Sequence, residues 1–237
     1  MPVDTQHPRL HLASRSPRRR ELLAQIGVGF DTLLLRSSPR DDRALDETPL
    51  TGEDPVDYVE RIARSKAEHG CRIVSWRRLL PQPVLAADTT IELAGELIGK
   101  PRDAEDARRI LQRLSGETHR VLTAVAIAFE VHMELALSIS EVRFRPLDEG
   151  EIGRYVASGE PMDKAGAYGI QGRAGMFIEH LSGSYSGVMG LPLCETAQLL
   201  KRFGYLLEGF RVNCLVHQPL FQLGCPVALK RSLRIRP

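Results

Sequence analysis

Three consecutive arginines follow a hydroxyl-rich turn near the start of the chain, in the segment LASRSPRRRELL. Residues 9–14 predict a short strand and residues 17–26 a helix, so the arginines at 18–20 fall in the first helical turn. Cations are unfavourable at this positive end of a helix dipole, which indicates a compensating anion. Backbone N–H groups, the Ser14 and Ser16 hydroxyls and the guanidinium groups would suit a phosphate chain. The alternative is a solvated basic helix start, because the segment has neither a Walker lysine nor a glycine-rich loop.

A carboxylate stands inside an apolar strand pattern at residues 84–93, VLAADTTIEL. Burying Asp88 there is costly unless the carboxylate is paired, bound to a metal or functional. A general base or a metal ligand belongs at such a strand end beside a cleft. Glu47, in a polar loop expected over 37–54, is a candidate second ligand for a divalent cation. The alternatives are a structural carboxylate at Asp88 and a plain surface acid at Glu47.

A lysine shares the apolar face of the next helix, which is expected over residues 55–69 and to end at Gly70. Val59 and Ile62 define that face, and helical spacing places Lys66 on it. A buried ammonium needs an anionic partner or a route to solvent. We expect Lys66 to reach a phosphate or a carboxylate at the edge of a site, with snorkelling along the core rim as the alternative.

A glycine-rich stretch, GEPMDKAGAYGIQG at residues 159–172, mixes charges of both signs with an amide. Glycines allow close approach of the backbone to a ligand, and Asp163 and Lys164 supply the charges. Gln171 offers one acceptor and two donors, which match the O4 and N3–H edge of uracil or thymine but would match adenine as well. A turn-rich structural loop is the alternative.

The elements that must position these residues alternate between strand-like and helix-like patterns, which predicts an α/β fold. The chain has 237 residues, 43% of them hydrophobic, and a net charge of +2. It can bury a sizeable core, and the near balance of charge argues against a histone-like chain while allowing a local basic pocket. Further strands are expected at 119–130, 133–147 and 176–181, and further helices at 103–114, 148–158 and 191–203.

The last part of the chain, residues 205–237, differs in character. It holds five Lys or Arg residues and one Glu, a net charge of +4, among large apolar residues. A strapping segment or a partner-binding tail would both fit. The N-terminal residues lack the apolar core of a signal peptide, and the longest apolar run, Val121 to Phe129, is too short to span a bilayer. We therefore expect a cytosolic protein that has no membrane partner.

Several separate motifs together resemble one family. In order over about residues 9–204, LASRSPRRRELL, YVERIARSKA, LAADTTI, GKPRDAEDARRIL, LSGETHRVLTAVA, GEPMDKAGAYGIQG and GLPLCET are similar to the Maf family of nucleoside triphosphate pyrophosphatases. The resemblance implies one domain over residues 1–204, with a mixed central β-sheet flanked by helices and two lobes around a central cleft, as in the inosine triphosphate pyrophosphatases. It also implies hydrolysis of a nucleoside triphosphate to the monophosphate and diphosphate, with water attacking the α-phosphorus and Mg²⁺ or Mn²⁺ as cofactor.

The same resemblance assigns roles to individual residues. The catalytic carboxylate falls on Asp88, which together with Glu47 would also hold the metal. Substrate and phosphate-binding roles fall on Ser14, Arg18, Arg19, Lys66, Lys100, Asp163 and Lys164. The stretch AYGIQG is similar to the branch of the family that acts on dTTP and UTP, and its specificity positions fall on Arg18, Thr89 and Gln171.

The expected partner is therefore a nucleoside triphosphate. Nucleic acid is not expected as a partner, and the sequence leaves a homodimer open. A different class of function also remains, namely a nucleotide-sensing regulator of cell division or a nucleic-acid-binding protein that uses the basic tail at 205–237. Deleting that tail would separate the two classes, because a tail-driven binder would lose a strongly salt-dependent affinity for nucleic acid.

Overall fold

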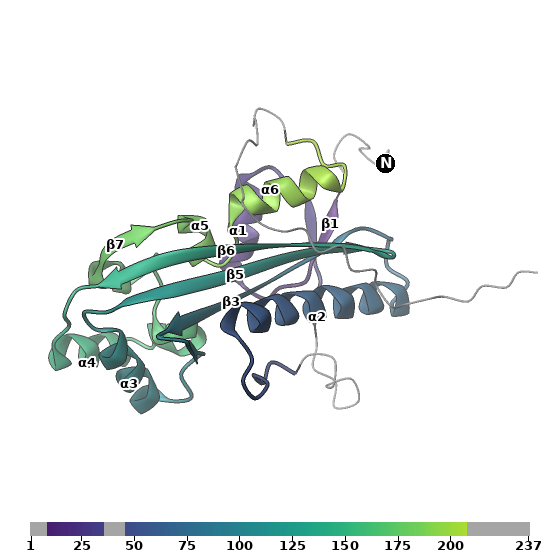
Figure 1. Cartoon of the computed structure of the whole chain (residues 1–237). Coiled ribbons are helices and arrows are strands. Elements are labelled where there is room, and N and C mark those ends of the chain that lie inside the picture. Colours follow the sequence, from purple (N-terminus) through teal and green to yellow (C-terminus); the bar gives the residue numbers. More distant parts are fainter. Residues whose placement is uncertain (1–8, 36–45, 208–237) are drawn as a thin grey trace, which may run out of the picture.

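The computed structural model describes residues 9–35 and 46–207, so nearly all of the extension predicted at 205–237 lies outside the described residues. A mixed sheet of seven strands forms the centre of the molecule, in the order β2-β1-β3-β5-β6-β7 with β4 on β3 (Figure 1). The parallel pairs are β1 with β2 and β1 with β3, and the other pairs are antiparallel. The strands are β1 (Leu10–Leu12), β2 (Phe30–Thr32), β3 (Val84–Leu93), β4 (Glu96–Ile98), β5 (Thr118–Phe129), β6 (His132–Phe144) and β7 (Ile178–Ser182).

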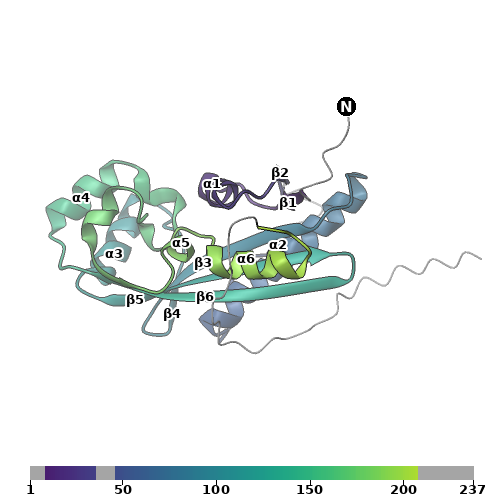
Figure 2. The same cartoon turned by 90° about the horizontal axis from the view of Figure 1, so that it is seen from above.

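Helices cover both faces of this sheet, which confirms the predicted α/β class. In Figure 1, α2 runs along the lower face, and α1 and α6 lie above the sheet. Seen from above in Figure 2, α3 and α4 gather at one end of the long strands β5 and β6, away from α1, β1 and β2. The helices are α1 (Pro17–Gln25), α2 (Pro55–Trp76), α3 (Ala104–Leu114), α4 (Glu149–Ala157), α5 (Tyr185–Val188) and α6 (Leu193–Arg202), with short 3₁₀ helices η2 (Glu160–Asp163), η3 (Ala165–Ala167) and η4 (Arg173–Phe177). None of the described helices is long and apolar enough to cross a membrane.

The alternation of side chains along β3 separates two of the cores. Val84 and Ala86 pack with the apolar face of α2, whereas Leu85 and Ala87 pack with α1 and α6. The same period of two continues along β5, so both faces of this half of the sheet are buried. A third cluster forms where α3 and α4 meet the far halves of the strands, around the fully buried Phe144.

The second helix does not end at Gly70, as the sequence predicted, but continues to Trp76. The glycine instead allows α2 to approach β3 closely. A Cβ atom added at Gly70 would lie 2.6 Å from the Cγ1 atom of Val84, so only glycine lets α2 lie this close to β3. The apolar face resumes beyond it with Ile73 and Val74, which are buried. The short elements β2 and α5 were not predicted, and β6 ends at Phe144 rather than at residue 147.

The middle of β3 has an open edge on the side of β1. There, β1 pairs with Val84 and Leu85, while β4 pairs with Ile91 to Leu93. Residues 86–90 lie between these two contacts. Within the described part of the chain, they pair with a strand only on the β5 side. This interruption of the sheet surrounds Asp88 and leaves room for side chains from α1.

Candidate active site

Asp88, Lys66 and Glu47 meet at one point. The Nζ atom of Lys66 lies 2.7 Å from Oδ1 of Asp88 and 2.7 Å from Oε1 of Glu47. The strand alternation turns Asp88 toward α2, and the helical spacing turns Lys66 toward β3. Only 16% of the lysine side chain and 13% of the aspartate side chain are exposed, against 51% for Glu47. The lysine on the apolar face therefore has carboxylate partners, and it does not simply snorkel along the core rim.

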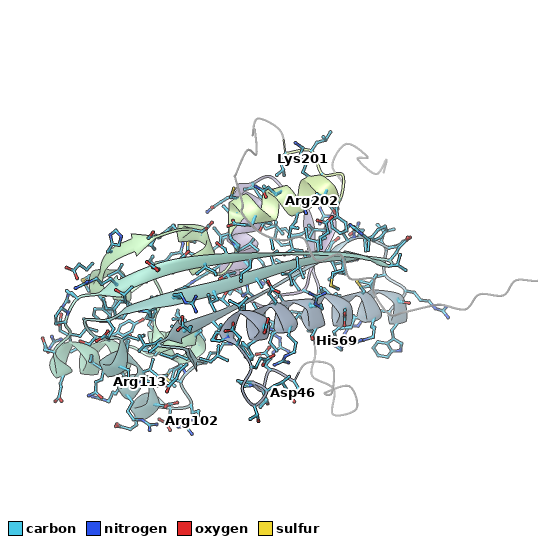
Figure 3. The ribbon with its side chains drawn as sticks, viewed as in Figure 1. Asp46, His69, Arg102, Arg113, Lys201 and Arg202 are labelled. Carbon is cyan, nitrogen blue, oxygen red and sulfur yellow. The ribbon has the colours of Figure 1, made fainter. Side chains whose placement is uncertain are left out.

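The loop that carries Glu47 is fastened to α2 by two side chains of that helix. The hydroxyl of Tyr58 donates to the carbonyl oxygen of Glu47 at 2.9 Å, and Arg61 donates to the carbonyl oxygen of Thr48 at 3.2 Å. In Figure 3, Asp46 lies in this loop, next to the start of α2. Burial and the nearby Asp88 and Glu47 raise the pKa of Tyr58 to about 12, so its hydroxyl stays a donor at neutral pH. The backbone is thus held where the carboxylate of Glu47 can reach Lys66.

Positive groups control the ionisation of Glu47. Partial burial by itself would raise the pKa of this carboxyl, but Lys66, Lys100 and Arg19 outweigh it and the net shift is downward. Glu47 therefore remains a carboxylate at neutral pH. The effect of Lys100 also shows that this lysine, at the end of the β3–β4 hairpin, belongs to the same electrostatic neighbourhood as Lys66.

The carboxylates of Asp88 and Glu47 are a donor set that suits a hard divalent cation. Mg²⁺ prefers oxygen ligands and is commonly held by one or two carboxylates, with water and substrate phosphate completing its coordination. The shared contact with Lys66 shows that both carboxylates can reach one cation. Across residues 9–35 and 46–207, no group of three or more His, Cys, Asp or Glu residues forms a site that protein ligands alone could complete. The residues fit a magnesium or manganese ion shared with a phosphate ligand.

The side chain of Arg19 makes hydrogen bonds with other residues of the protein. Its Nε donates to the carbonyl oxygen of Gly190 at 2.8 Å, and Nη1 donates to the carbonyl oxygen of Ala87 at 2.8 Å. The hydroxyl oxygens of Thr89 and Ser14 lie 3.2 and 3.5 Å from its Nη2 and Nη1 atoms. Burial lowers the pKa of Arg19, while Asp88 and Glu47 oppose that shift. Arg19 fills the open edge of β3, and its predicted phosphate contact stays a prediction.

Arg18 points instead to the glycine-rich loop, although it is the neighbour of Arg19 in the sequence. A Cβ atom added at Gly169 would lie 2.9 Å both from Nη2 of Arg18 and from Cε of Lys164. Lys164 in turn contacts the carboxylate of Asp163. Burial would raise the pKa of Asp163, but Lys164 and Arg18 outweigh it and the net shift is downward. Arg18, Asp163 and Lys164 therefore form a second charged group, built from α1 and the loop at 159–172.

The specificity residues predicted at Thr89 and Gln171 lie in different surroundings. Thr89 faces the side of the sheet opposite to Asp88, and its hydroxyl oxygen lies 3.1 Å from that of Thr123 on β5. Thr123 also donates to the carbonyl oxygen of Gly187 at 2.8 Å. Gln171 is exposed in a turn closed by a hydrogen bond from the Gly172 N–H to the Gly169 carbonyl oxygen.

Thr123 was not recognised in the sequence. The signal was a hydroxyl at a buried position of an otherwise apolar strand, where a polar group needs a partner. Ser14, by contrast, was recognised. It is buried, and its Oγ accepts the Ser16 backbone N–H at 3.2 Å as well as facing Arg19. The structure thus places both hydroxyl groups beside the interrupted edge and the loops that border it.

Comparisons with known proteins show which family this chain resembles. The family model for Maf-like proteins matches residues 9–203. A dTTP/UTP pyrophosphatase from Dechloromonas aromatica is 66% identical over 197 residues, which are 83% of this chain and 98% of the relative. A dTTP/UTP pyrophosphatase from Aromatoleum aromaticum is 64% identical over 200 residues, 84% of this chain and 97% of the relative. Among solved structures, the Ham1 protein of Staphylococcus aureus aligns at a TM-score of 0.44 and 14% identity, over 82% of this chain and 97% of its own.

The family model extends from the arginine-rich turn to the end of α6, and the two bacterial relatives match 83% and 84% of the chain. This chain belongs to the family of Maf-like proteins.

Proposed function

We propose that this protein hydrolyses dTTP and UTP to the nucleoside monophosphate and pyrophosphate. The observation that carries the proposal is the nearly buried Asp88 in the middle of β3, whose ion-pair partner Lys66 also pairs with Glu47. Arg18, Lys100 and Lys164 add positive charge on the neighbouring elements. The relatives described as dTTP/UTP pyrophosphatases support the choice of substrate, because they are similar to this chain over nearly their whole length.

In the proposed reaction, Asp88 acts as the general base. One of its carboxylate oxygens, Oδ1, pairs with Lys66, which leaves Oδ2 to accept a proton from water. The oxygen of that water forms a bond to the α-phosphorus, and the bond from the α-phosphorus to the bridging oxygen of the β-phosphate breaks. Pyrophosphate leaves with that oxygen. Lys66 holds the carboxylate in place, as a fixed charge that needs no rearrangement during the reaction.

Positive side chains would offset the charge of the triphosphate. Phosphoryl transfer depends mainly on positioning and electrostatic stabilisation, so several fixed cations around one carboxylate suit it. We assign this role to Arg18, Lys100 and Lys164. We also propose that Glu47 and Asp88 hold a divalent cation. When bound, Mg²⁺ or Mn²⁺ would neutralise phosphate charge and polarise the reacting phosphoryl group.

We assign recognition of the base to Gln171, with Arg18 and Thr89 as further specificity residues. An amide can donate to the O4 oxygen and accept from the N3–H group of uracil or thymine, whereas cytosine presents the reverse pattern at these two positions. The position of Gln171 supports this role, because its turn includes Gly169, which Arg18 and Lys164 approach.

The test is pyrophosphate release across a panel of nucleoside triphosphates, with and without Mg²⁺ or Mn²⁺. We expect dTTP and UTP to be hydrolysed best. Asp88→Asn should lose turnover by about 10³-fold or more while still binding nucleotide, because a general base contributes about 10²–10⁴-fold. Arg113→Ala is the control, since Arg113 lies on α3 (Figure 3), where its exposed side chain forms an ion pair with Glu96. Normal turnover in Asp88→Asn would refute the assignment of the base, and no hydrolysis of dTTP or UTP would refute the function.

A further inference from the structure

We propose that Glu160 is a positioning residue for base recognition, because its carboxylate joins the two ends of the loop that carries Lys164 and Gln171. The inference rests on the proposed function, and Glu160 is not among the site residues predicted from the sequence. Glu160 begins η2, and Arg173 begins η4, with the loop between them. Oε2 of Glu160 accepts the backbone N–H of Arg173 at 3.2 Å, so the carboxylate closes the loop across thirteen positions.

A second oxygen of the same carboxylate fixes the loop to the core. Oε1 of Glu160 accepts the hydroxyl of Tyr155 on α4 at 3.1 Å. The ring of Tyr155 packs edge-on against Phe177, with the ring centroids 5.1 Å apart, and both residues are buried. Burial and the charge of Glu160 raise the pKa of Tyr155, which keeps its hydroxyl protonated as a donor. Tyr155 therefore ties the loop to the buried core.

The loop is built around this carboxylate. A Cβ atom added at Gly172 would lie 1.8 Å from Oε1 of Glu160, so the carboxylate occupies the space that a side chain at 172 would need. The backbone carbonyl oxygen of Glu160 accepts Nζ of Lys164 at 2.6 Å. One residue thus sets the position of the lysine through its main chain and the position of the turn holding Gln171 through its side chain.

Glu160 acts through Gln171 because the amide reads a base only if its two hydrogen-bonding atoms are held in a fixed orientation. A loop that is ordered before binding loses less conformational entropy when the ligand arrives. Removal of the carboxylate releases the N–H of Arg173 and the hydroxyl of Tyr155, so the turn at 169–172 gains freedom. The expected effect falls on selection among bases, since Asp88, Lys66 and Glu47 belong to other elements.

The test is a double-mutant cycle that combines Glu160→Ala with Gln171→Ala. The readout is the ratio of kcat/KM for dTTP to that for dCTP, with thermal unfolding measured for each variant. We expect Glu160→Ala alone to lower this ratio about 10-fold, which corresponds to loss of one charge-assisted hydrogen bond. In the Gln171→Ala background the same change should lower the ratio by less than about 2-fold, because nothing is left for the loop to orient.

Two further variants keep the test decisive. Tyr155→Phe removes only the hydroxyl that holds Oε1 and should lower the ratio in the same direction, so it carries the test if Glu160→Ala does not fold. Glu117→Ala, an exposed acid elsewhere on the surface, should leave the ratio unchanged. An equal fall in kcat/KM for both nucleotides, or full additivity with Gln171→Ala, overturns the role of Glu160. Absence of dTTP hydrolysis in the unaltered protein would instead refute the proposed function.

Discussion

Replacement by alanine should have different effects at the neighbouring residues Arg18 and Arg19. The side chain of Arg19 donates to the carbonyl oxygens of Gly190 and Ala87, both buried, and reaches two hydroxyl oxygens besides. Arg18 approaches Gly169 and Lys164 at the loop expected to meet the substrate. We therefore predict that Arg19→Ala lowers the stability of the fold, whereas Arg18→Ala lowers activity and leaves stability unchanged.

The loss of stability expected for Arg19→Ala follows from the carbonyl oxygens that would lose their hydrogen-bond donor. Each buried carbonyl that loses its donor costs about 1–3 kcal/mol, and removing the buried guanidinium offsets part of the sum by relieving its own desolvation. We expect a net loss of about 2–4 kcal/mol in the free energy of unfolding. For a chain of this size, such a loss lowers Tm by about 5–15 °C. Arg18→Ala should change the free energy of unfolding by about 0.5 kcal/mol or less.

The assay is urea unfolding and thermal unfolding of the two variants, with kcat/KM for dTTP measured in parallel. Arg18→Ala should lose about 10–100-fold in kcat/KM, the value of one charged hydrogen bond to a phosphate. Arg19→Lys should fall between the unaltered protein and Arg19→Ala, because an ammonium cannot reach both carbonyl oxygens and both hydroxyls. The reasoning would be wrong if Arg19→Ala unfolded at the same temperature as the unaltered protein, or if Arg18→Ala were the less stable of the pair.

Three further predictions concern single side chains. Lys66→Met should lower the free energy of unfolding by about 3 kcal/mol and abolish turnover, because Asp88 and Glu47 lose the ammonium group that they share. An unchanged free energy of unfolding and an unchanged kcat would contradict this. Burial lowers the pKa of His119 to about 4, so the unfolded state binds more protons between pH 6.5 and 4. Stability should be full above pH 6.5 and fall by about 3 kcal/mol on acidification to pH 4, and urea titrations of His119→Gln should show a smaller fall. Gly70→Ala should cost about 1–2 kcal/mol despite the better helix propensity of alanine, since the new Cβ meets Val84, and Val84→Ala should restore part of the loss in chemical denaturation.

Much of the candidate site could be predicted because its residues violate local rules. An aspartate in an apolar strand and a lysine on an apolar helix face are each unfavourable alone, so their pairing could be anticipated. The structure indeed places Asp88 and Lys66 in contact. The α/β class and most helices followed from periodicity in the same way, since residues three or four apart share a helix face and residues two apart share a strand face.

Other features depend on contacts between distant segments, which periodicity does not report. The sequence predicts a helix end at Gly70 because glycine often ends helices, yet glycine is needed there because α2 lies so close to β3. Arg18 and Arg19 are chemically identical in the sequence, and only the position of the β3 edge distinguishes them. Glu160 reaches Arg173, thirteen positions away, and Thr123 reaches Gly187, 64 positions away. Only the three-dimensional arrangement shows what these side chains hold.

The interrupted edge of β3 has a consequence for self-association. Exposed strand edges are templates on which another extended chain can add, and proteins usually block them with a further strand, a helix or a charged side chain. Here the guanidinium of Arg19 takes the Ala87 carbonyl that a foreign strand would need. Arg19 thus contributes to protection against edge-to-edge aggregation in the middle of the sheet. A variant at this position would be prone to precipitate during folding as well as to unfold.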